Sequence, residues 1–108
     1  MSDPFTPWPP SEEDIAWLVG ILEGEGSFCK VQGRVCLSLG MNDEDVVSKA
    51  AKMMGISYHV TTYGPNKTRR YSFMILGRAR AGRIMGTIYP LMGERRRGQI
   101  QKALQFDV

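Results

Sequence analysis

Residues 17–26 of this 108-residue chain read WLVGILEGEG, and Ser27-Phe28 follows directly. The stretch joins an apolar helix end to two carboxylates, Glu23 and Glu25, and then to the start of a strand. Its apolar side chains are too numerous for a helix that faces water, so other parts of the structure must cover it. The chain thereby carries an acidic group, of the kind that binds hard metal ions, to the end of a buried helix.

The boundaries of this helix follow from its flanks. Ser11 is followed three residues later by Asp14, which resembles a capping box with Asp in place of Glu. Two prolines directly before Ser11 block an earlier start. The spacing predicts a helix from about Glu12 to Leu22 or Gly24.

Two glycines of the helix, Gly20 and Gly24, lie four positions apart and therefore on one helix face. Without side chains there, the backbone of another helix can approach closely, a geometry best known from membrane helices. Apolar residues occupy several other sides of the helix, so this end must be covered on more than one side: Ile15, Trp17, Leu18, Val19, Ile21 and Leu22.

Residues 18–26, LVGILEGEG, resemble position for position the nine-residue motif of the LAGLIDADG homing-endonuclease family. The ending at residues 24–28, GEGSF, is a common variant in that family. Family members pack two such helices side by side through their small residues. The resemblance to a single-motif member implies a homodimer whose interface includes Leu18, Gly20, Ile21 and Gly24.

The same resemblance assigns roles to the acidic residues. In the family, the second acidic position of each motif holds a divalent cation between the DNA strands. Glu25 stands at that position, which implies a catalytic carboxylate and metal ligand, with the backbone carbonyl of Gly24 as a further ligand. Glu23, at the first acidic position, is expected to cap a helix or to support the ligands through a hydrogen bond.

Length and composition indicate one domain. The 108 residues have room for a single core, and 43% apolar with 23% charged residues is ordinary for a globular protein. No apolar run is long enough to span a membrane, and the N-terminus lacks the pattern of a signal peptide. We therefore expect a cytoplasmic protein of a bacterial or phage host, or a protein of an organelle interior.

The first ten residues are expected to form a flexible N-terminal tail, pinned at most by Phe5 or Trp8. This leaves residues 11–108 as the DNA-binding and endonuclease domain that the resemblance implies. The tail is predicted from its content of acid and proline, namely Asp3, Pro4, Pro7, Pro9 and Pro10.

The net charge of +3 is distributed unevenly. The segment from Lys67 to Lys102 contains ten basic residues and one acid, Glu94, a net of +9, so the remainder is net negative. Such segregation is typical of proteins that bind a polyanion, and arginine suits bidentate contacts to phosphate and guanine. The alternative is a set of solvated helix faces.

The remaining elements can be predicted coarsely. Strands at 27–32 and 34–39 form a hairpin, a helix runs from about residue 42 to 55, and strands at 57–63 and 69–76 form a second hairpin. Helices at about 78–89 and 94–106 follow, separated by Pro90. This α+β order, αββαββα(α), resembles one LAGLIDADG half, which implies a saddle-shaped, four-stranded antiparallel sheet with helices on one face and DNA on the other.

Alternation in the first hairpin predicts which side chains share a face. A tight Gln32-Gly33 turn pairs Val31 with Arg34, Cys29 with Cys36, and Ser27 with Ser38, all on one face. The opposite face is the predicted core, formed by Phe28, Val35, Leu37 and Leu39.

In the second hairpin, Tyr71, Phe73 and Ile75 are predicted to be buried. Tyr58 and Val60 are assigned to the core as well, although a one-residue bulge would exchange them with His59 and Thr61. Together with the resemblance, these faces define a DNA-contacting set: Ser27, Arg34, Cys36, Ser38, His59, Thr61, Lys67, Arg69, Arg70 and Ser72.

The two cysteines, Cys29 and Cys36, allow more than one interpretation. Directly paired cross-strand cysteines could form a disulfide, but a chain without an export signal is expected to keep them reduced. A zinc site would need more ligands than these thiols and His59 provide. We interpret them as structural thiols, and the methionines, including Met53, Met54, Met85 and Met92, as core residues.

The reaction implied is phosphodiester hydrolysis with Mg²⁺ as cofactor. Because Mg²⁺ prefers several hard oxygen ligands, a single Glu25 cannot surround it, and phosphates and a second chain must supply the rest. One motif per chain therefore implies a homodimer on double-stranded DNA. Two-fold symmetry then favours a pseudo-palindromic target.

Family enzymes also carry a basic residue near the start of the last helix and a polar residue, often Gln, after the second strand. Arg95 or Arg96 occupies the first place, where Lys is more usual. Asn42 occupies the second, so either it substitutes for Gln or the water network is depleted.

Three functions therefore remain open. The first is a dimeric, Mg²⁺-dependent homing endonuclease of a mobile element such as an intron. The second is a DNA-binding regulator on the same scaffold that no longer cuts. The third is an RNA maturase that assists intron splicing. A retained Glu25 favours the first over the second, since a carboxylate aimed at phosphates hinders binding unless a cation neutralises it.

Overall fold

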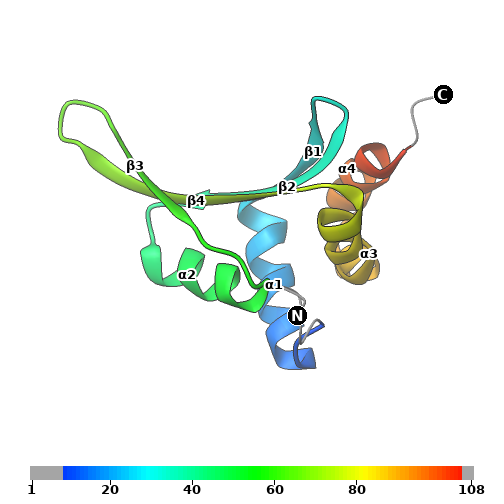
Figure 1. Ribbon diagram of the computed structural model, residues 1–108. Helices are drawn as coiled ribbons and strands as arrows, with labels where there is room; N and C mark the ends of the chain where they lie inside the picture. Colours follow the sequence, from blue (N-terminus) through cyan, green and yellow to red (C-terminus); the bar gives the residue numbers. More distant parts are fainter. Residues whose placement is uncertain (1–8, 106–108) are drawn as a thin grey trace, which may run out of the picture.

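The computed structural model describes residues 9–105. It has the predicted α+β architecture, with one antiparallel sheet of four strands in the order β1-β2-β4-β3. The helices gather on one face, and both hairpins bend away from them, so that the open face is concave along the strands (Figure 1). The main elements are α1 (Glu12–Glu25), β1 (Gly26–Val31), β2 (Arg34–Met41), α2 (Glu44–Met53), β3 (His59–Tyr63), β4 (Thr68–Leu76), α3 (Arg83–Ile88) and α4 (Glu94–Leu104).

Helix α1 begins as predicted. The side chain of Ser11 accepts a hydrogen bond from the backbone nitrogen of Asp14 at 3.2 Å, which satisfies one of the free amides of the first turn. The helix runs to Glu25 and passes directly into β1. A side chain at Gly26 would be blocked, since its Cβ would lie 2.8 Å from the carbonyl oxygen of Leu22. The motif therefore ends in a turn that requires glycine.

The first hairpin has the predicted register. Gln32 and Gly33 both have positive φ, 52° and 78°, as a type I′ turn requires. Cys29 pairs with Cys36 and Ser27 with Ser38, and the predicted core face of Phe28, Val35, Leu37 and Leu39 is buried. Strand β2 continues two residues further than predicted, to Met41, because it is a central strand and pairs with β4 as well.

The second hairpin confirms the alternation but corrects one burial. Tyr71, Phe73 and Ile75 are buried as predicted. Val60 pairs with Tyr71 and so lies on the helix side of the sheet, as predicted, yet it is 52% exposed. The prediction that Val60 is buried is wrong because β3 is an edge strand, and all five of its residues are exposed.

Helix α2 ends at Met53, two residues before Gly55, which was predicted to stop the helix and has a φ of 68°. The helix predicted at 78–89 is instead divided into a π-helical turn at Arg78–Gly82, the short α3, and a 3-10 turn at Tyr89–Leu91. Glycines within this segment weaken a continuous α-helix, and Pro90 cannot donate to one. The predicted end of the last helix near residue 106 lies outside the described residues.

The core lies between the helices and the sheet. Its largest fully buried side chains include Leu18, Leu22, Leu37, Ile84 and Ile100. Met54, Met85 and Met92 are buried and Met53 is half-buried, which agrees with the interpretation of methionines as core residues. Within residues 9–105, no helix is both long and apolar enough to cross a membrane. The predicted tail lies outside the described residues except for its last two prolines.

Candidate functional site

The open face of the sheet brings together most of the predicted DNA-contacting residues. The strand register places on this one face Ser27, Arg34, Cys36, Ser38, His59, Thr61, Arg70 and Ser72. Met74 lies on the same face, as the alternation of the fourth strand from Arg70 and Ser72 predicts, and is 54% exposed. Tyr63, which shares the face and is 52% exposed, was not predicted, although alternation from Thr61 indicates it.

Three residues of the predicted DNA-contacting set are not exposed on the open face of the sheet. Cys36 shares the open face but is 1% exposed, so its thiol is closed off by its neighbours and we omit it from the set. Arg69 is exposed but pairs with Thr62 on the helix side of the sheet, one residue out of phase with Arg70. Lys67 lies in the turn at the tip of the second hairpin, with a positive φ of 52°.

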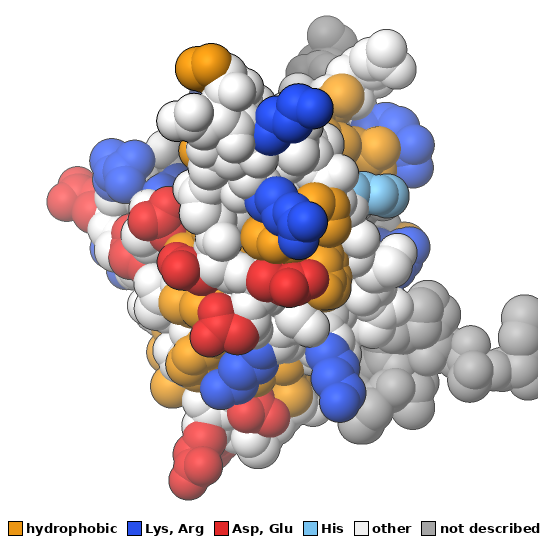
Figure 2. Space-filling model, turned by 90° about the vertical axis from the view of Figure 1, so that its left-hand side faces the viewer, with side chains coloured by type: hydrophobic (Ala, Val, Ile, Leu, Met, Phe, Trp, Pro, Cys, Tyr) orange, Lys and Arg blue, Asp and Glu red, His pale blue; other side chains and the backbone are white. Residues whose placement is uncertain are grey.

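The ionisable side chains of the four strands include basic residues but no carboxylates. None of the four strands contains Asp or Glu, whereas they contain Lys30, Arg34, Arg69, Arg70 and His59. Figure 2, which views the molecule from the side of α2 and the β3–β4 hairpin, shows basic but no acidic side chains at its upper end, with the acidic ones below. Segregation of this kind favours contact of the sheet with a polyanion.

Two arginines on the open face lie against glycines. A Cβ added to Gly40 would lie 2.5 Å from Nη2 of Arg70, and one added to Gly77 would lie 3.4 Å from Nη2 of Arg34. Gly40 pairs with Ser72, two residues along β4 from Arg70, so the arginine reaches diagonally across the strand pair. The glycines leave room for these long side chains on the concave face.

The cysteine pair is reduced in the structure. Cys29 is exposed and Cys36 is buried, and both are free thiols. Burial raises the pKa of Cys36 to about 11, with further increases from the charge of Cys29 and from a hydrogen bond with it. The interpretation as structural thiols therefore holds for Cys36, while Cys29 is accessible on the open face.

The two carboxylates at the acidic end of α1, those of Glu23 and Glu25, lie in different environments. The carboxylate of Glu23 accepts a hydrogen bond of 2.5 Å from the backbone nitrogen of Gly93, the residue that precedes α4. Glu23 thus caps a helix, but that helix is α4 and not its own. Glu25 is exposed, and no hydrogen bond or ion pair to its carboxylate is present within residues 9–105.

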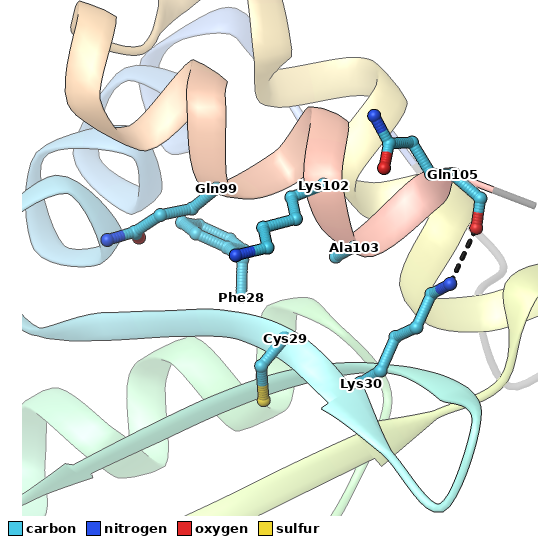
Figure 3. A pocket seen from close by; sticks show the side chains of 7 residues that line it. All are labelled: Phe28, Cys29, Lys30, Gln99, Lys102, Ala103 and Gln105. Carbon is cyan, nitrogen blue, oxygen red and sulfur yellow. Dashed lines mark hydrogen bonds between the residues drawn. The ribbon is translucent and has the colours of Figure 1, made fainter. Parts of the chain in front are cut away.

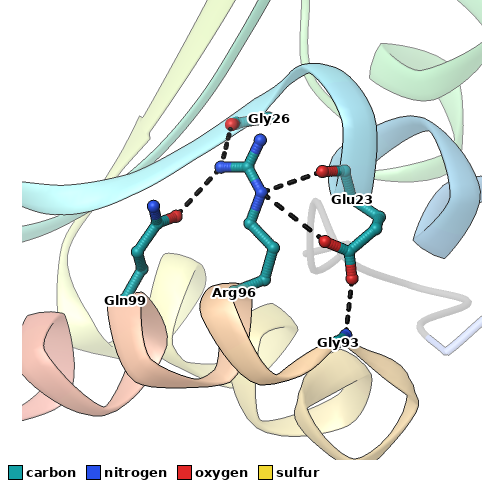
Figure 4. Close-up of polar contacts among 5 residues, drawn as sticks. All are labelled: Glu23, Gly26, Gly93, Arg96 and Gln99. Carbon is teal, nitrogen blue, oxygen red and sulfur yellow. Dashed lines mark hydrogen bonds and ion pairs between the residues drawn. The ribbon is translucent and has the colours of Figure 1, made fainter.

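Arg96 is the only charged or polar side chain that is buried in the described part of the chain, at 7% exposure. Its Nε donates to the carbonyl of Glu23 at 2.8 Å, and its Nη1 donates to the carbonyl of Gly26 at 2.7 Å and to Oε1 of Gln99 at 2.9 Å (Figure 4). Arg96 is therefore turned into the protein, while Arg95 is exposed in the first turn of α4.

The acidic end of α1 offers oxygen atoms of the kind that a hard cation prefers. The carbonyl of Leu22 accepts from Gly26, and that of Glu23 accepts from Arg96. The last turn of α1 contains no basic residue. A carboxylate and a carbonyl at the negative end of a helix dipole suit Mg²⁺, although they supply only part of its shell. Residues 9–105 contain no cluster of three or more His, Cys, Asp or Glu that could complete it.

The face of α1 opposite the core is not covered by another element within the described residues. Ile15, Leu18 and Leu22 face inward, so the prediction that Leu18 lies at a dimer interface is wrong: it is 0% exposed within its own core. Gly20 and Gly24 are exposed, and a Cβ on either would meet nothing within 4 Å. Ala16 is exposed and Ile21 is half-buried beside them. Exposed small residues in this arrangement permit close approach of a second helix.

Asn42 is engaged elsewhere. Its Nδ2 donates to the carbonyl of Arg69 at 2.8 Å and to the hydroxyl of Tyr63 at 3.1 Å. The side chain therefore fastens the end of β2 to the second hairpin. It does not occupy the position of a free amide that organises water beside Glu25.

A shallow cleft of about 440 Å³ separates β1 from α4. Figure 3 shows that Lys30 and Lys102 enter it from opposite sides, and Lys30 Nζ donates to the carbonyl of Gln105 at 2.6 Å. Phe28 forms part of its wall, with Cys29 at its rim. The cleft carries positive charge but no acid and is therefore separate from the acidic end of α1.

No protein-family model and no curated protein matches the chain.

Proposed function

We propose that this protein is a homodimeric, Mg²⁺-dependent DNA endonuclease of the homing type, in which the open face of the sheet binds double-stranded DNA. One observation carries the proposal. A concave sheet without acidic residues is joined directly to a single carboxylate, Glu25, that lacks a cationic partner within residues 9–105. A nucleic-acid surface explains the first feature, and a metal ion explains the second.

In this proposal, the residues at the end of α1 bind the metal ion, and a residue at the start of α4 stabilises charge. The carboxylate of Glu25 and the carbonyl of Gly24 would hold Mg²⁺, and phosphate oxygens and a second protomer would supply the remaining ligands. When bound, the ion polarises the scissile phosphate, lowers the pKa of an attacking water and stabilises the leaving 3′ oxygen. Arg95, which is exposed, is the available basic group for the developing negative charge.

The dimer is proposed from the exposed face of α1. Ala16, Gly20 and Gly24 allow a second copy of α1 to approach closely, which would bring two Glu25 side chains near one another. Because the same surface meets itself, the interface would be isologous, and the preferred DNA site would be pseudo-palindromic.

A regulator that binds DNA without cutting is the second candidate. It is favoured by two observations, namely that the Asn42 amide is used in the hairpin and that Arg96 is buried. Either would reduce the number of groups left to organise water. In that case Glu25 would be dispensable for binding.

A selection from a random-site duplex library tests the proposal. The chain and the Glu25→Gln variant are each incubated with the library in Mg²⁺ and in EDTA, and both retention and cutting are scored. We expect retention in every sample and cutting only by the unaltered chain with Mg²⁺. Retention without cutting in any sample would establish the regulator, and preference for structured intron RNA over duplex DNA would overturn both.

A further inference from the structure

Arg96 holds the backbone on both sides of the residues proposed to bind metal. The carbonyls of Glu23 and Gly26, which accept from Nε and Nη1 at 2.8 and 2.7 Å, bracket Gly24 and Glu25 in the chain. Nε also lies 3.8 Å from the carboxylate of Glu23. One guanidinium therefore spans the turn from α1 to β1 (Figure 4).

The guanidinium is itself held in place. Gln99, one turn further along α4, accepts from the same Nη1 at 2.9 Å, and the ring of Phe28 lies 5.9 Å from Cζ. The carboxylate of Glu23 also caps the start of α4 through Gly93, so α1 and α4 are joined at two points. Because a planar guanidinium donates in fixed directions, this arrangement defines the position of the turn more closely than a lysine would.

The neighbouring arginines do not share this environment. Arg95 is exposed and Arg97 is half-buried, and neither donates a hydrogen bond from its side chain to α1 in the described structure. Of three consecutive arginines, only the middle one reaches the acidic turn.

We propose that Arg96 is a positioning residue, which fixes the carbonyl of Gly24 and the carboxylate of Glu25 in the geometry that binds the metal ion and takes no direct part in the reaction. This inference rests on the proposed function, since it concerns the same metal site. Arg96 is then the basic residue near the start of α4 that acts from the protein interior, without contact to the substrate. Arg95, which is exposed, is the neighbouring arginine that can face the substrate.

Metal affinity can be measured without cleavage by using Tb³⁺ alone as the probe. Trp17 lies eight residues before Glu25 in the same helix, about 12 Å away along the axis, close enough to sensitise terbium luminescence. We expect Arg96→Lys to weaken binding roughly ten- to hundredfold, as is usual when a group that orients a ligand is lost. Arg96→Met should weaken it further, and Arg97→Lys should leave it unchanged. Glu25→Gln identifies the site by abolishing the signal.

Amide hydrogen exchange at residues 24–27 gives a second measurement that does not depend on metal. Arg96→Lys should accelerate exchange there relative to Arg97→Lys, with the rest of α1 unchanged. If Arg96→Lys does not fold, Gln99→Ala, which retains the arginine but removes one of its restraints, should show the same changes in a weaker form.

The outcomes separate this inference from the proposed function. Unchanged terbium affinity, or unchanged exchange at residues 24–27, in a folded Arg96→Lys variant would overturn the positioning role even if the protein cuts DNA. If the unaltered chain gives no Glu25-dependent signal, the metal site fails. The inference then fails with it, and faster exchange in Arg96→Lys would assign the arginine to the fold alone.

Discussion

The guanidinium of Arg70 lies over the backbone of Gly40 on the neighbouring central strand. A Cβ at residue 40 would approach Nη2 to 2.5 Å and Cζ to 2.9 Å, distances at which the arginine must move. The absence of a side chain at one position thus determines where a positive charge lies on the concave face of the sheet.

Gly40→Ala should therefore displace Arg70 and weaken binding to a selected DNA site. If Arg70 contacts a guanine, we expect a loss of about 1–3 kcal/mol, similar to that of Arg70→Met. Fluorescence anisotropy with the selected duplex, and with a duplex altered at single base pairs, measures the effect. Arg69→Met is the matched control, since the same charge is removed from the helix side of the sheet. Equal losses from Arg69→Met and Arg70→Met would indicate non-specific charge attraction.

Gly20→Ala should stabilise the monomer and weaken the dimer. The added methyl meets nothing within 4 Å, so the monomer gains helix propensity of about 1 kcal/mol. At a close helix–helix contact, however, the two methyl groups would separate the protomers. Thermal denaturation and sedimentation velocity measure the two effects on the same sample.

Gly98→Ala in α4 is the control for this substitution, since Gly98 is also exposed and has open space around its Cβ. It should raise stability without changing the sedimentation coefficient. A chain that is monomeric at all concentrations, with and without DNA, would contradict the proposed dimer.

Removal of the negative charge at residue 25 should stabilise the fold while removing activity. Glu25 lies at the negative end of the α1 dipole, and no basic residue lies in the last turn. We expect Glu25→Gln to raise the free energy of unfolding by about 0.3–1 kcal/mol at low ionic strength, and by less at high salt. Urea denaturation at two salt concentrations measures this change.

Glu23→Ala is expected to have the opposite effect on stability. It removes the acceptor for the amide of Gly93 at the start of α4, which should cost about 1 kcal/mol. If Glu25→Gln destabilised the fold as much as Glu23→Ala, the carboxylate of Glu25 would be structural, and its proposed role in metal binding would lose its support.

The two thiols should differ in reactivity. Iodoacetamide at pH 8 should modify the exposed Cys29 in the folded protein and reach the buried Cys36 only after unfolding in urea. Mass spectrometry of peptic fragments distinguishes the two sites. Equal modification of both thiols in the folded protein would show that the sheet opens readily at this pair.

The stability of the fold should also depend on the titration of Cys36. Burial raises its pKa from the ordinary value of 9.0 to about 11, so the thiol of the folded protein stays protonated to a higher pH than that of the unfolded chain. The associated stability is present below about pH 9 and is lost as the pH rises from 9 towards 11. The free energy of unfolding of Cys36→Ala should therefore decline less over this range than that of the unaltered chain.

Elements whose signals are local are predictable from the sequence. The Ser11 cap defined the start of α1, and the Gln32-Gly33 turn defined the register of the first hairpin, because a two-residue loop permits only one pairing. Alternation then assigned Phe28 and Phe73 to the core. These features depend on residues close together in the chain, so no knowledge of the remaining structure was needed.

Residues of the same type differ in role because of their tertiary contacts, which local sequence patterns do not reveal. Arg95, Arg96 and Arg97 are identical in the sequence, and only the contact of α4 with the end of α1 turns the middle one inward. Leu18 and Val60 were misassigned for the same reason: burial depends on what covers a face, and the covering elements come from distant parts of the chain. Local periodicity predicts the direction of a side chain, whereas only packing determines what that side chain meets.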